Sequence, residues 1–183
     1  MPMDNIQRAI KKGSGEIESN EVFFEGTFET IKNGVSIVVK TLSTNNNRTV
    51  AKINEIFKRN GIELAKQGSA SRNFERLGII YIKVPNDNDF EDVFLSDALE
   101  FGANDAIIDD DIAIVKCNPE AYDDMLEAFK SKNIYNIIEE DSGICLYPNV
   151  NVKIDDKTNE AINKLIYMLE DFEDVQEIYD NRN

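Results

Sequence analysis

Hydrophobic positions along the chain recur with a period of about two residues in some stretches and about 3.6 in others, which indicates alternating strands and helices. Residues 35–42 are a β-branched, strand-like run. Downstream, Val50, Ile53 and Phe57 recur at helical spacing, and Asn60-Gly61 is a helix stop signal. For the first and last parts of the chain, the pattern predicts strands over 35–42, 69–77, 144–154 and 175–179, and helices over 48–60 and after Asp155 or Asp156.

The middle of the chain repeats this order of elements. Asn118-Pro119 has the arrangement favoured at a helix start, and the acidic turn Asp110-Asp111 separates two short apolar runs. The pattern here predicts strands over 78–84, 106–109, 112–117 and 134–139, and helices from Asp89 to near Gly102 and from Asn118 onward. Both parts of the chain therefore match the βαββαβ order of ferredoxin-like domains.

We expect an α+β fold in which one ferredoxin-like domain is inserted into another. The inserted domain takes residues 78–142, and the discontinuous domain takes 22–77 plus 143–183. Short, right-handed connections permit this arrangement. Residues 1–21 are expected to form a short helix over 4–12 and a polar linker.

The chain has 183 residues, no histidine and two cysteines. Without histidine, imidazole-activated serine or cysteine nucleophiles are excluded, and so is the commonest zinc ligand. Cys117 and Cys145 are too few for a disulfide scaffold and lie in apolar stretches, which indicates buried thiols in a reducing compartment. No apolar run approaches the roughly 20 residues needed to span a bilayer. We therefore expect a protein that binds a partner, with no enzymatic activity, cofactor, metal ion or membrane attachment.

Charge is distributed unevenly along the chain, whose formal net charge is −15. Residues 84–183 carry 7 Lys and Arg against 26 Asp and Glu, whereas residues 30–83 carry 10 basic against 3 acidic side chains. Such asymmetry is typical of proteins that bind a polyanion through one part of the surface, although two ordinary solvated surfaces would give the same counts. Charge alone leaves both interpretations open.

Two loops within the basic segment 30–83 are candidate phosphate-binding sites. The first runs into the helix predicted over 48–60, where backbone N–H groups and the helix dipole favour an anion; an ordinary helix cap with surface cations is the alternative. The second follows that helix and precedes Arg72 and Arg76, whose spacing would place both on one face of a strand. The candidate contacts in these loops are Asn47, Arg48, Thr49, Lys52, Lys66, Ser69 and Arg72.

The acidic runs are interpreted as solvated turns rather than metal sites. Asp109, Asp110 and Asp111 are consecutive, so their carboxylates point in different directions, and no further ligand spacing supports them. The run 112–117 lacks the aromatic residues with which RNA-recognition motifs stack on bases. Base reading on the sheet of the inserted domain is therefore not expected.

Four motifs follow one another in the chain: MPMDNIQRAIKKG at 1–13, NNNRTV at 45–50, Gly68-Ser69 with Phe74 and Gly78, and LEDFEDVQEIYDN at 169–181. Together they resemble the YebC/PmpR family, whose mitochondrial members are translational activators of cytochrome c oxidase subunit I. Arg8, Lys11 and Lys12 of the first motif join the candidate nucleic-acid contacts. Members of the family usually begin with a basic helical domain containing Gly-His-Ser-Lys-Trp. Because this chain has neither His nor Trp, its N-terminal helix would be a remnant of that domain.

The resemblance implies a non-enzymatic expression factor. We favour a translation factor that binds the ribosome, rRNA or mRNA, because a phosphate-directed contact needs only a basic face and no DNA-reading motif is evident. A DNA-binding transcriptional regulator is the alternative, and a sensor that holds a small molecule between its two domains is a third hypothesis. The protein would act as a monomer, in the cytoplasm of a bacterium or in the mitochondrial or another organellar matrix of a eukaryote.

Overall fold

The computed structural model describes residues 22–86 and 89–182. These residues form two compact units. The first contains the described residues up to Phe74 and those from Pro148 onward, and the second contains Glu75–Tyr147. In the part of the chain that is described, no helix is both long and apolar enough to cross a membrane.

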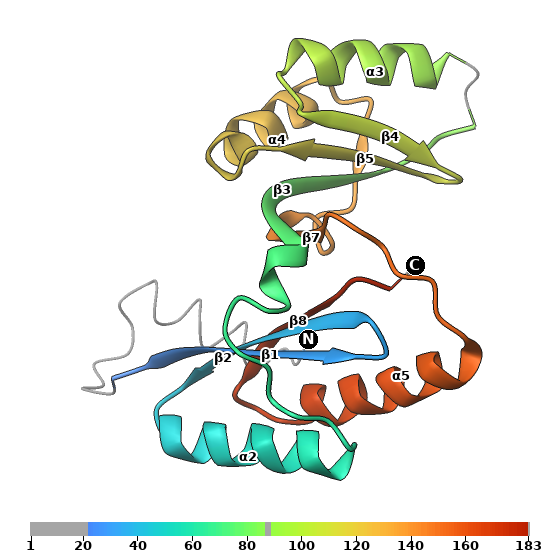
Figure 1. The fold of residues 1–183 in the computed structure, drawn as a ribbon. Coiled ribbons are helices and arrows are strands. Elements are labelled where there is room, and N and C mark those ends of the chain that lie inside the picture. The colour runs from blue at the N-terminus through green and yellow to red at the C-terminus, as the bar shows by residue number, and fades with distance from the viewer. Residues whose placement is uncertain (1–21, 87–88, 183) are drawn as a thin grey trace. The chain divides into compact units, whose positions relative to one another are not determined.

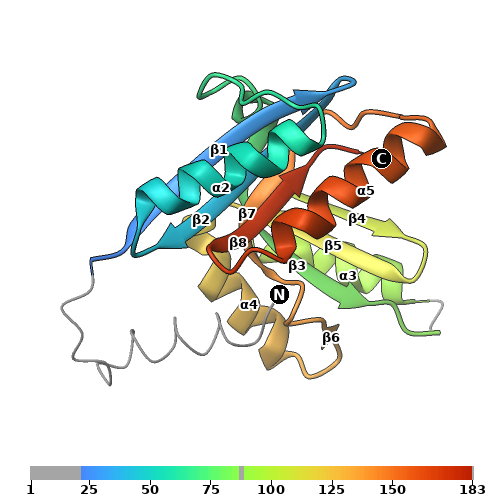
Figure 2. The ribbon, with the colours of Figure 1, turned by 90° about the horizontal axis from the view of Figure 1, so that it is seen from below.

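The first unit is a three-stranded antiparallel sheet with two helices on one face (Figure 1). β1 (Phe24–Lys32) and β2 (Val35–Ser43) form a hairpin, and β8 (Val175–Asp180) pairs with the other edge of β2. α2 (Asn46–Arg59) and α5 (Asp156–Glu170) lie side by side on this sheet (Figure 2). The hydrophobic core of the unit lies between the two helices and the strands.

Local sequence explains both the hairpin and the helix packing of this unit. Asn33-Gly34 forms the hairpin turn with φ angles of 50° and 87°, which Asn and Gly adopt most readily. Ile53 and Phe57 lie one turn apart on α2, as Leu165 and Leu169 do on α5, so each helix presents an apolar stripe to the sheet. These four side chains are at most 1% exposed. Burial of each contributes about 1.5–3 kcal/mol.

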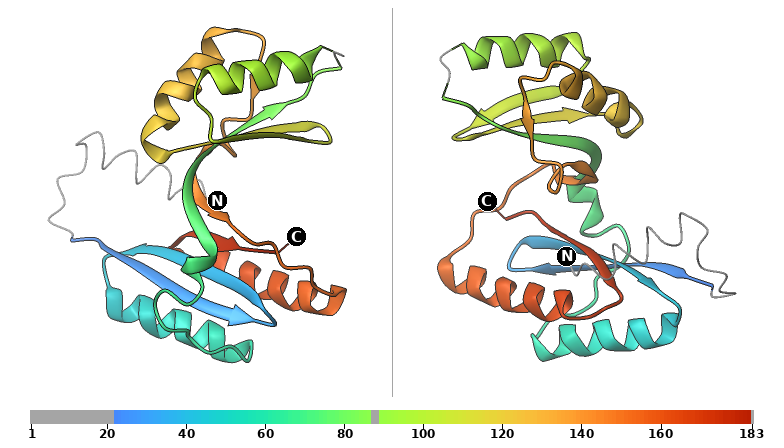
Figure 3. Two further views of the ribbon diagram at one scale, coloured as in Figure 1. Left: turned by 45° about the horizontal axis from the view of Figure 1, so that its top comes forward. Right: turned by 180° about the vertical axis from the view of Figure 1, so that it is seen from behind.

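The second unit is a βαββαβ domain. Its elements, in chain order, are β3 (Phe74–Lys83), α3 (Phe90–Glu100), β4 (Asp105–Asp109), β5 (Ile112–Cys117), α4 (Tyr122–Ser131) and β6 (Asn136–Ile137). The strands pair antiparallel in the order β4-β5-β3-β6, so the first strand lies between the third and the fourth, as in ferredoxin-like domains. α3 and α4 pack on one face of this sheet (Figure 3). The α+β architecture of the two units confirms the predicted fold class. The βαββαβ order itself is found in the second unit, whereas the first unit has three strands, two of which form a hairpin.

The strand predicted over 69–77 is wrong as a separate element. Its first part is a 3-10 turn (Ser71–Asn73), and the rest belongs to β3, which runs without a break through Gly78. This glycine marks a close approach rather than a boundary. A Cβ at this position would lie 2.7 Å from Sγ of Cys117 and 2.9 Å from Cβ of Tyr122.

The strand predicted over 144–154 is too long. β7 (Gly143–Pro148) ends at a proline, which has no N–H to donate, and it pairs with β3. Val152 makes only an isolated parallel bridge to Arg182. The sequence pattern also does not predict β1, because the polar composition of this strand, including Glu29, conceals its alternation.

Candidate nucleic-acid interface

The first predicted loop leads into α2 and is capped by its own side chains. Oδ1 of Asn45 accepts a hydrogen bond from the backbone N–H of Arg48 (3.1 Å), and the Asn45 carbonyl accepts one from the N–H of Thr49 (3.2 Å). The N–H of Asn45 in turn donates to Oγ of Ser43 (2.9 Å). First-turn N–H groups are thus partly satisfied within the chain, which leaves fewer of them for a phosphate.

Arg48 and Thr49 both contact Asp174, which directly precedes β8. Nη2 of Arg48 lies 2.6 Å from Oδ1 of Asp174 and 3.3 Å from Oε1 of Glu173. The hydroxyl of Thr49 donates to the other oxygen of Asp174, Oδ2, at 2.7 Å. The Asp174 side chain is 5% exposed, so these donors replace the water that a carboxylate otherwise requires. The second and fourth sequence motifs therefore meet at one buried carboxylate.

Asn47 and Lys52 also lie on the first turns of α2. Asn47 is exposed. Nζ of Lys52 lies 3.3 Å from Oε2 of Glu55, which also pairs with Arg59. The charges of Arg48 and Lys52 are thus partly neutralised by carboxylates of this chain, which weakens the attraction of both residues for a phosphate.

A buried carboxylate fixes the conformation of the second predicted loop. Glu29 on β1 is 3% exposed. Its two oxygens accept hydrogen bonds from the backbone N–H groups of Gly68 (2.8 Å), Ala70 (2.7 Å) and Ser71 (3.0 Å), and from the Ser71 hydroxyl (3.0 Å). Burial by itself would raise the pKa of Glu29, but these donors outweigh it and lower the pKa below its ordinary value. The carboxylate therefore stays ionised and holds the loop.

The loop from Lys66 to Arg72 presents two cations to solvent. Both residues are exposed, and neither forms an ion pair with another described residue. Ser69 is half-buried, and its N–H donates to the carbonyl of Lys66 (3.0 Å). Arg72 lies in the 3-10 turn rather than on a strand, so the expectation that it shares a strand face with Arg76 is wrong. The hydrogen bonds to Glu29 thus hold the Lys66–Arg72 loop in one conformation, and the loop carries two positive charges that form no ion pair with a described residue.

The structure does not bring the two loops together. Phe28 packs into the core that the helices cover, so the side chain of its neighbour Glu29 points to the opposite face of the sheet from α2. The 3-10 turn at the end of the loop that Glu29 holds lies on that face (Figure 1). Along β1, Glu29 is five residues from Phe24, the partner of Ser43 at the end of β2, an offset of roughly 17 Å. The two loops therefore do not form a single phosphate-binding site.

The helix predicted over 4–12, with its three candidate cations, lies outside the described residues. Sequence reasoning also missed the two buried carboxylates that organise these loops, Glu29 and Asp174. Glu29 carries no local signal, because its strand is not predicted from the sequence and its partner Ala70 lies 41 residues later in the chain. Asp174 carries none, because it follows other acidic residues at the end of a helix.

The acidic runs do not gather into a metal centre. In residues 22–86 and 89–182, no group of three or more His, Cys, Asp or Glu side chains is arranged to hold a metal ion. Cys117 is fully buried, and its burial raises the pKa of the thiol, which disfavours the reactive thiolate. Cys145 is partly buried.

Known proteins match this chain over most of its length. A family model described as TACO1/YebC second and third domain matches residues 19–182. A probable transcriptional regulatory protein from a Nitratiruptor species is 36% identical over 184 residues, covering 99% of this chain and 74% of that protein. One from Borreliella afzelii is 37% identical over 182 residues, covering 99% and 72%. The crystal structure of a conserved hypothetical protein from Aquifex aeolicus matches this chain with a TM-score of 0.76 and 33% sequence identity. The match covers 100% of this chain and 74% of the Aquifex chain.

Proposed function

The chain belongs to the TACO1/YebC family, and from this membership we propose that it regulates gene expression by binding nucleic acid, without catalysing a reaction. The names of its relatives, probable transcriptional regulatory proteins, support a regulatory role. The binding role is supported by the Lys66–Arg72 loop.

The observation that carries the proposal is the conformation of this loop. A phosphate contact is strongest when the cation is free of internal partners and already held in place. Lys66 and Arg72 form no ion pair with the described residues, and Glu29 holds the backbone between them. The start of α2 is the weaker candidate, because Arg48 is engaged by Asp174.

DNA is the first candidate ligand, because the relatives are named for transcription. Ribosomal or messenger RNA, in a translational role, is the second, and one observation favours it. The second unit carries 5 Lys and Arg against 18 Asp and Glu, a net charge of −13 that duplex DNA would repel. On a ribosome, the same unit could face basic proteins. Either role would place the protein in the bacterial cytoplasm or in an organellar matrix.

A double charge reversal tests the interface. Lys66→Glu/Arg72→Glu is compared with Lys157→Glu/Lys164→Glu, which changes two exposed lysines of α5 and alters the net charge equally. Fluorescence anisotropy measures the affinity for labelled duplex DNA and for single-stranded RNA over a range of salt concentrations. We expect the loop variant to bind about tenfold more weakly, with a salt slope smaller by about two, and the α5 variant to bind like the wild type.

The outcomes separate the two roles. Sequence-selective binding of duplex DNA would favour transcription, and binding of RNA with ribosome co-sedimentation would favour translation. Equal losses in the two variants would show that only net charge matters and would overturn the loop as the interface. If the wild-type chain binds neither nucleic acid, the proposed function itself is wrong.

A further inference from the structure

We propose that the sheet of the second unit docks a protein segment rich in basic and apolar residues, on the face that its own helices leave uncovered. Side chains alternate along β5, so Ala113 and Val115 pack against α3 and α4 while Ile112 and Ile114 face the other way. The pairing of the strands directs Tyr81 of β3 to the same side. This inference goes beyond the proposed function, because it concerns another unit and another class of partner.

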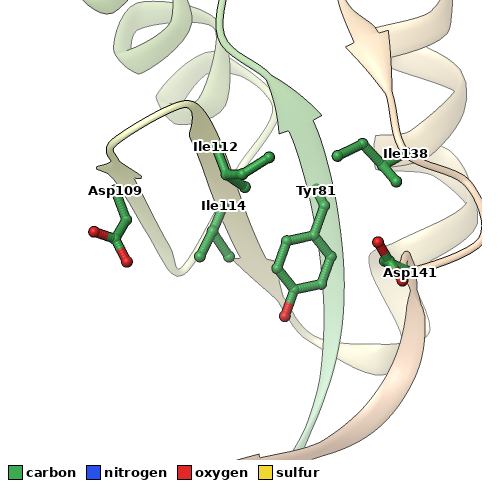
Figure 4. Close-up of a pocket in the computed structure, with 6 residues that line it drawn as sticks. All are labelled: Tyr81, Asp109, Ile112, Ile114, Ile138 and Asp141. Atoms are coloured by element: carbon green, nitrogen blue, oxygen red, sulfur yellow. The ribbon is translucent and has the colours of Figure 1, made fainter. Parts of the chain in front are cut away.

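An apolar row crosses three strands on this face. Ile114 lies opposite Tyr81 of β3 on one side and opposite Ile107 of β4 on the other. Together with Ile112 and with Ile138, which follows β6, Tyr81 and Ile114 line a groove of about 470 Å³ (Figure 4). Ile107 is 37% exposed, and the other four side chains are partly exposed. These five side chains form the open-face patch, a contiguous apolar surface of the kind that marks interaction sites.

Carboxylates border the open-face patch. Asp109 and Asp141 stand at two sides of the groove (Figure 4), and neither forms an ion pair with a described residue. Lys83 of β3, opposite Ile112, offsets one negative charge. Three further exposed carboxylates in the adjacent turns are likewise without an ion pair in the described part of the chain: Asp110, Asp111 and Glu140.

The negative charge around the open-face patch indicates which class of partner would bind there. A nucleic acid would bring its phosphates against the carboxylate rim and be repelled. A protein segment with lysine or arginine on either side of an apolar side chain matches both features, because the apolar centre supplies buried area and the rim orients the cations. The net charge of −13 on this unit would also attract such a segment before contact.

The apolar centre is tested with a fluorescein-labelled synthetic peptide of alternating leucine and lysine, whose affinity for the full chain is measured by anisotropy. Ile114→Ser removes the centre of the patch. Leu99→Ser is its matched control, because this leucine of α3 is 79% exposed and lies outside the patch. We expect Ile114→Ser to weaken binding about tenfold and Leu99→Ser to leave it unchanged.

The carboxylate rim is tested with paired neutral variants. Asp109→Asn/Asp141→Asn is compared with Asp123→Asn/Asp124→Asn on α4, which changes the net charge equally. The rim variant should bind the peptide about threefold more weakly at low salt, and the difference should shrink as salt screens the charges. Equal weakening in both variants would mean non-specific attraction and would overturn the proposal.

Four further measurements test the proposal, and the first three need only the wild-type protein, so they hold even if a variant folds poorly. Backbone amide shifts of the wild-type protein during peptide titration should change most in β3 and β5, and changes confined to the first unit would overturn it. A serine-lysine peptide that binds equally well would show that charge alone acts. Single-stranded RNA that displaces the peptide, or a dimer in solution that Ile114→Ser dissociates, would assign the patch to another occupant and would also refute the proposal.

Discussion

The guanidinium of Arg48 lies 2.6 Å from the carboxylate of Asp174, which is 126 residues later in the chain. Because Asp174 is buried and also accepts a hydrogen bond from Thr49, this contact joins the start of α2 to the start of β8. Residues of the second and fourth sequence motifs thus form one contact that holds the two chain segments of the first unit together. Any loss of binding in an Arg48 variant must therefore be separated from a loss of stability.

Arg48→Ala is expected to lower the free energy of unfolding by about 2 kcal/mol, because it leaves a buried carboxylate short of a charged partner. The cost should stay below that of a fully buried pair, since the Arg48 side chain is 49% exposed. Asp174→Asn should lower the free energy of unfolding by less, because this variant leaves no buried charge. In the double variant, Asp174→Asn should recover part of the Arg48→Ala loss. Denaturant unfolding followed by circular dichroism measures all three, and additive losses would contradict the coupling.

Glu29→Gln tests whether one carboxylate fixes the Lys66–Arg72 loop. The amide keeps the size of the side chain but replaces one acceptor by a donor that faces other N–H groups, at an expected cost of about 2 kcal/mol. Hydrogen exchange at the amides of Gly68, Ala70 and Ser71 should become faster. Glu25→Gln, on an exposed position of the same strand, is the control and should change neither property. Unchanged exchange in Glu29→Gln would show that the loop holds its conformation by other means.

The two units differ in how far local sequence predicts them. In the second unit, Asp89 and Asn118-Pro119 signal helix starts, and α3 and the turn leading into α4 begin directly after these signals. In the first unit, β1 contains Glu29, whose buried carboxylate is stabilised by hydrogen bonds from a distant loop; one donor, the N–H of Ala70, lies 41 residues later in the chain. Local patterns cannot register that pairing. For the same reason, they indicate the cation at Arg48 but not the distant carboxylate that engages it.

Acid should destabilise the fold through two buried carboxylates. Burial alone would raise the pKa of Asp97, but hydrogen bonds from the Tyr135 hydroxyl (2.7 Å) and the Lys132 ammonium (2.9 Å) outweigh it and lower the pKa, as happens at Glu29. A carboxylate with a lowered folded pKa stabilises the protein above its unfolded pKa, and this contribution is lost as the pH falls toward the folded pKa. Stability should therefore fall as the pH drops below the ordinary values of 4.5 for Glu29 and 3.8 for Asp97.

Denaturant unfolding at a series of pH values from about 7 down to about 2 measures this dependence. Asp97→Asn and Glu29→Gln should each be less stable than the wild type at neutral pH. Each variant should also lose less free energy of unfolding than the wild type as the pH falls into the acid range. Asp123→Asn, on the exposed face of α4, is the matched control and should keep the wild-type slope. If both test variants lose as much free energy of unfolding in acid as the wild type, other carboxylates govern acid unfolding.

Gly78→Ala tests whether the glycine inside β3 is required by a close approach of α4. The added methyl group would lie 2.7 Å from Sγ of Cys117 and 2.9 Å from Cβ of Tyr122, and both residues are buried, so neither can move without disturbing the core. We expect a loss of about 2 kcal/mol by thermal or denaturant unfolding, the usual cost of overpacking. Gly143→Ala is the control, because a Cβ there meets nothing within 4 Å. Adding Cys117→Ala should recover only part of the loss, since Tyr122 remains in place. Full recovery would show that the steric conflict involves only the sulfur atom. A Gly78→Ala protein as stable as the wild type would show that β3 and α4 can accommodate a methyl group at this position.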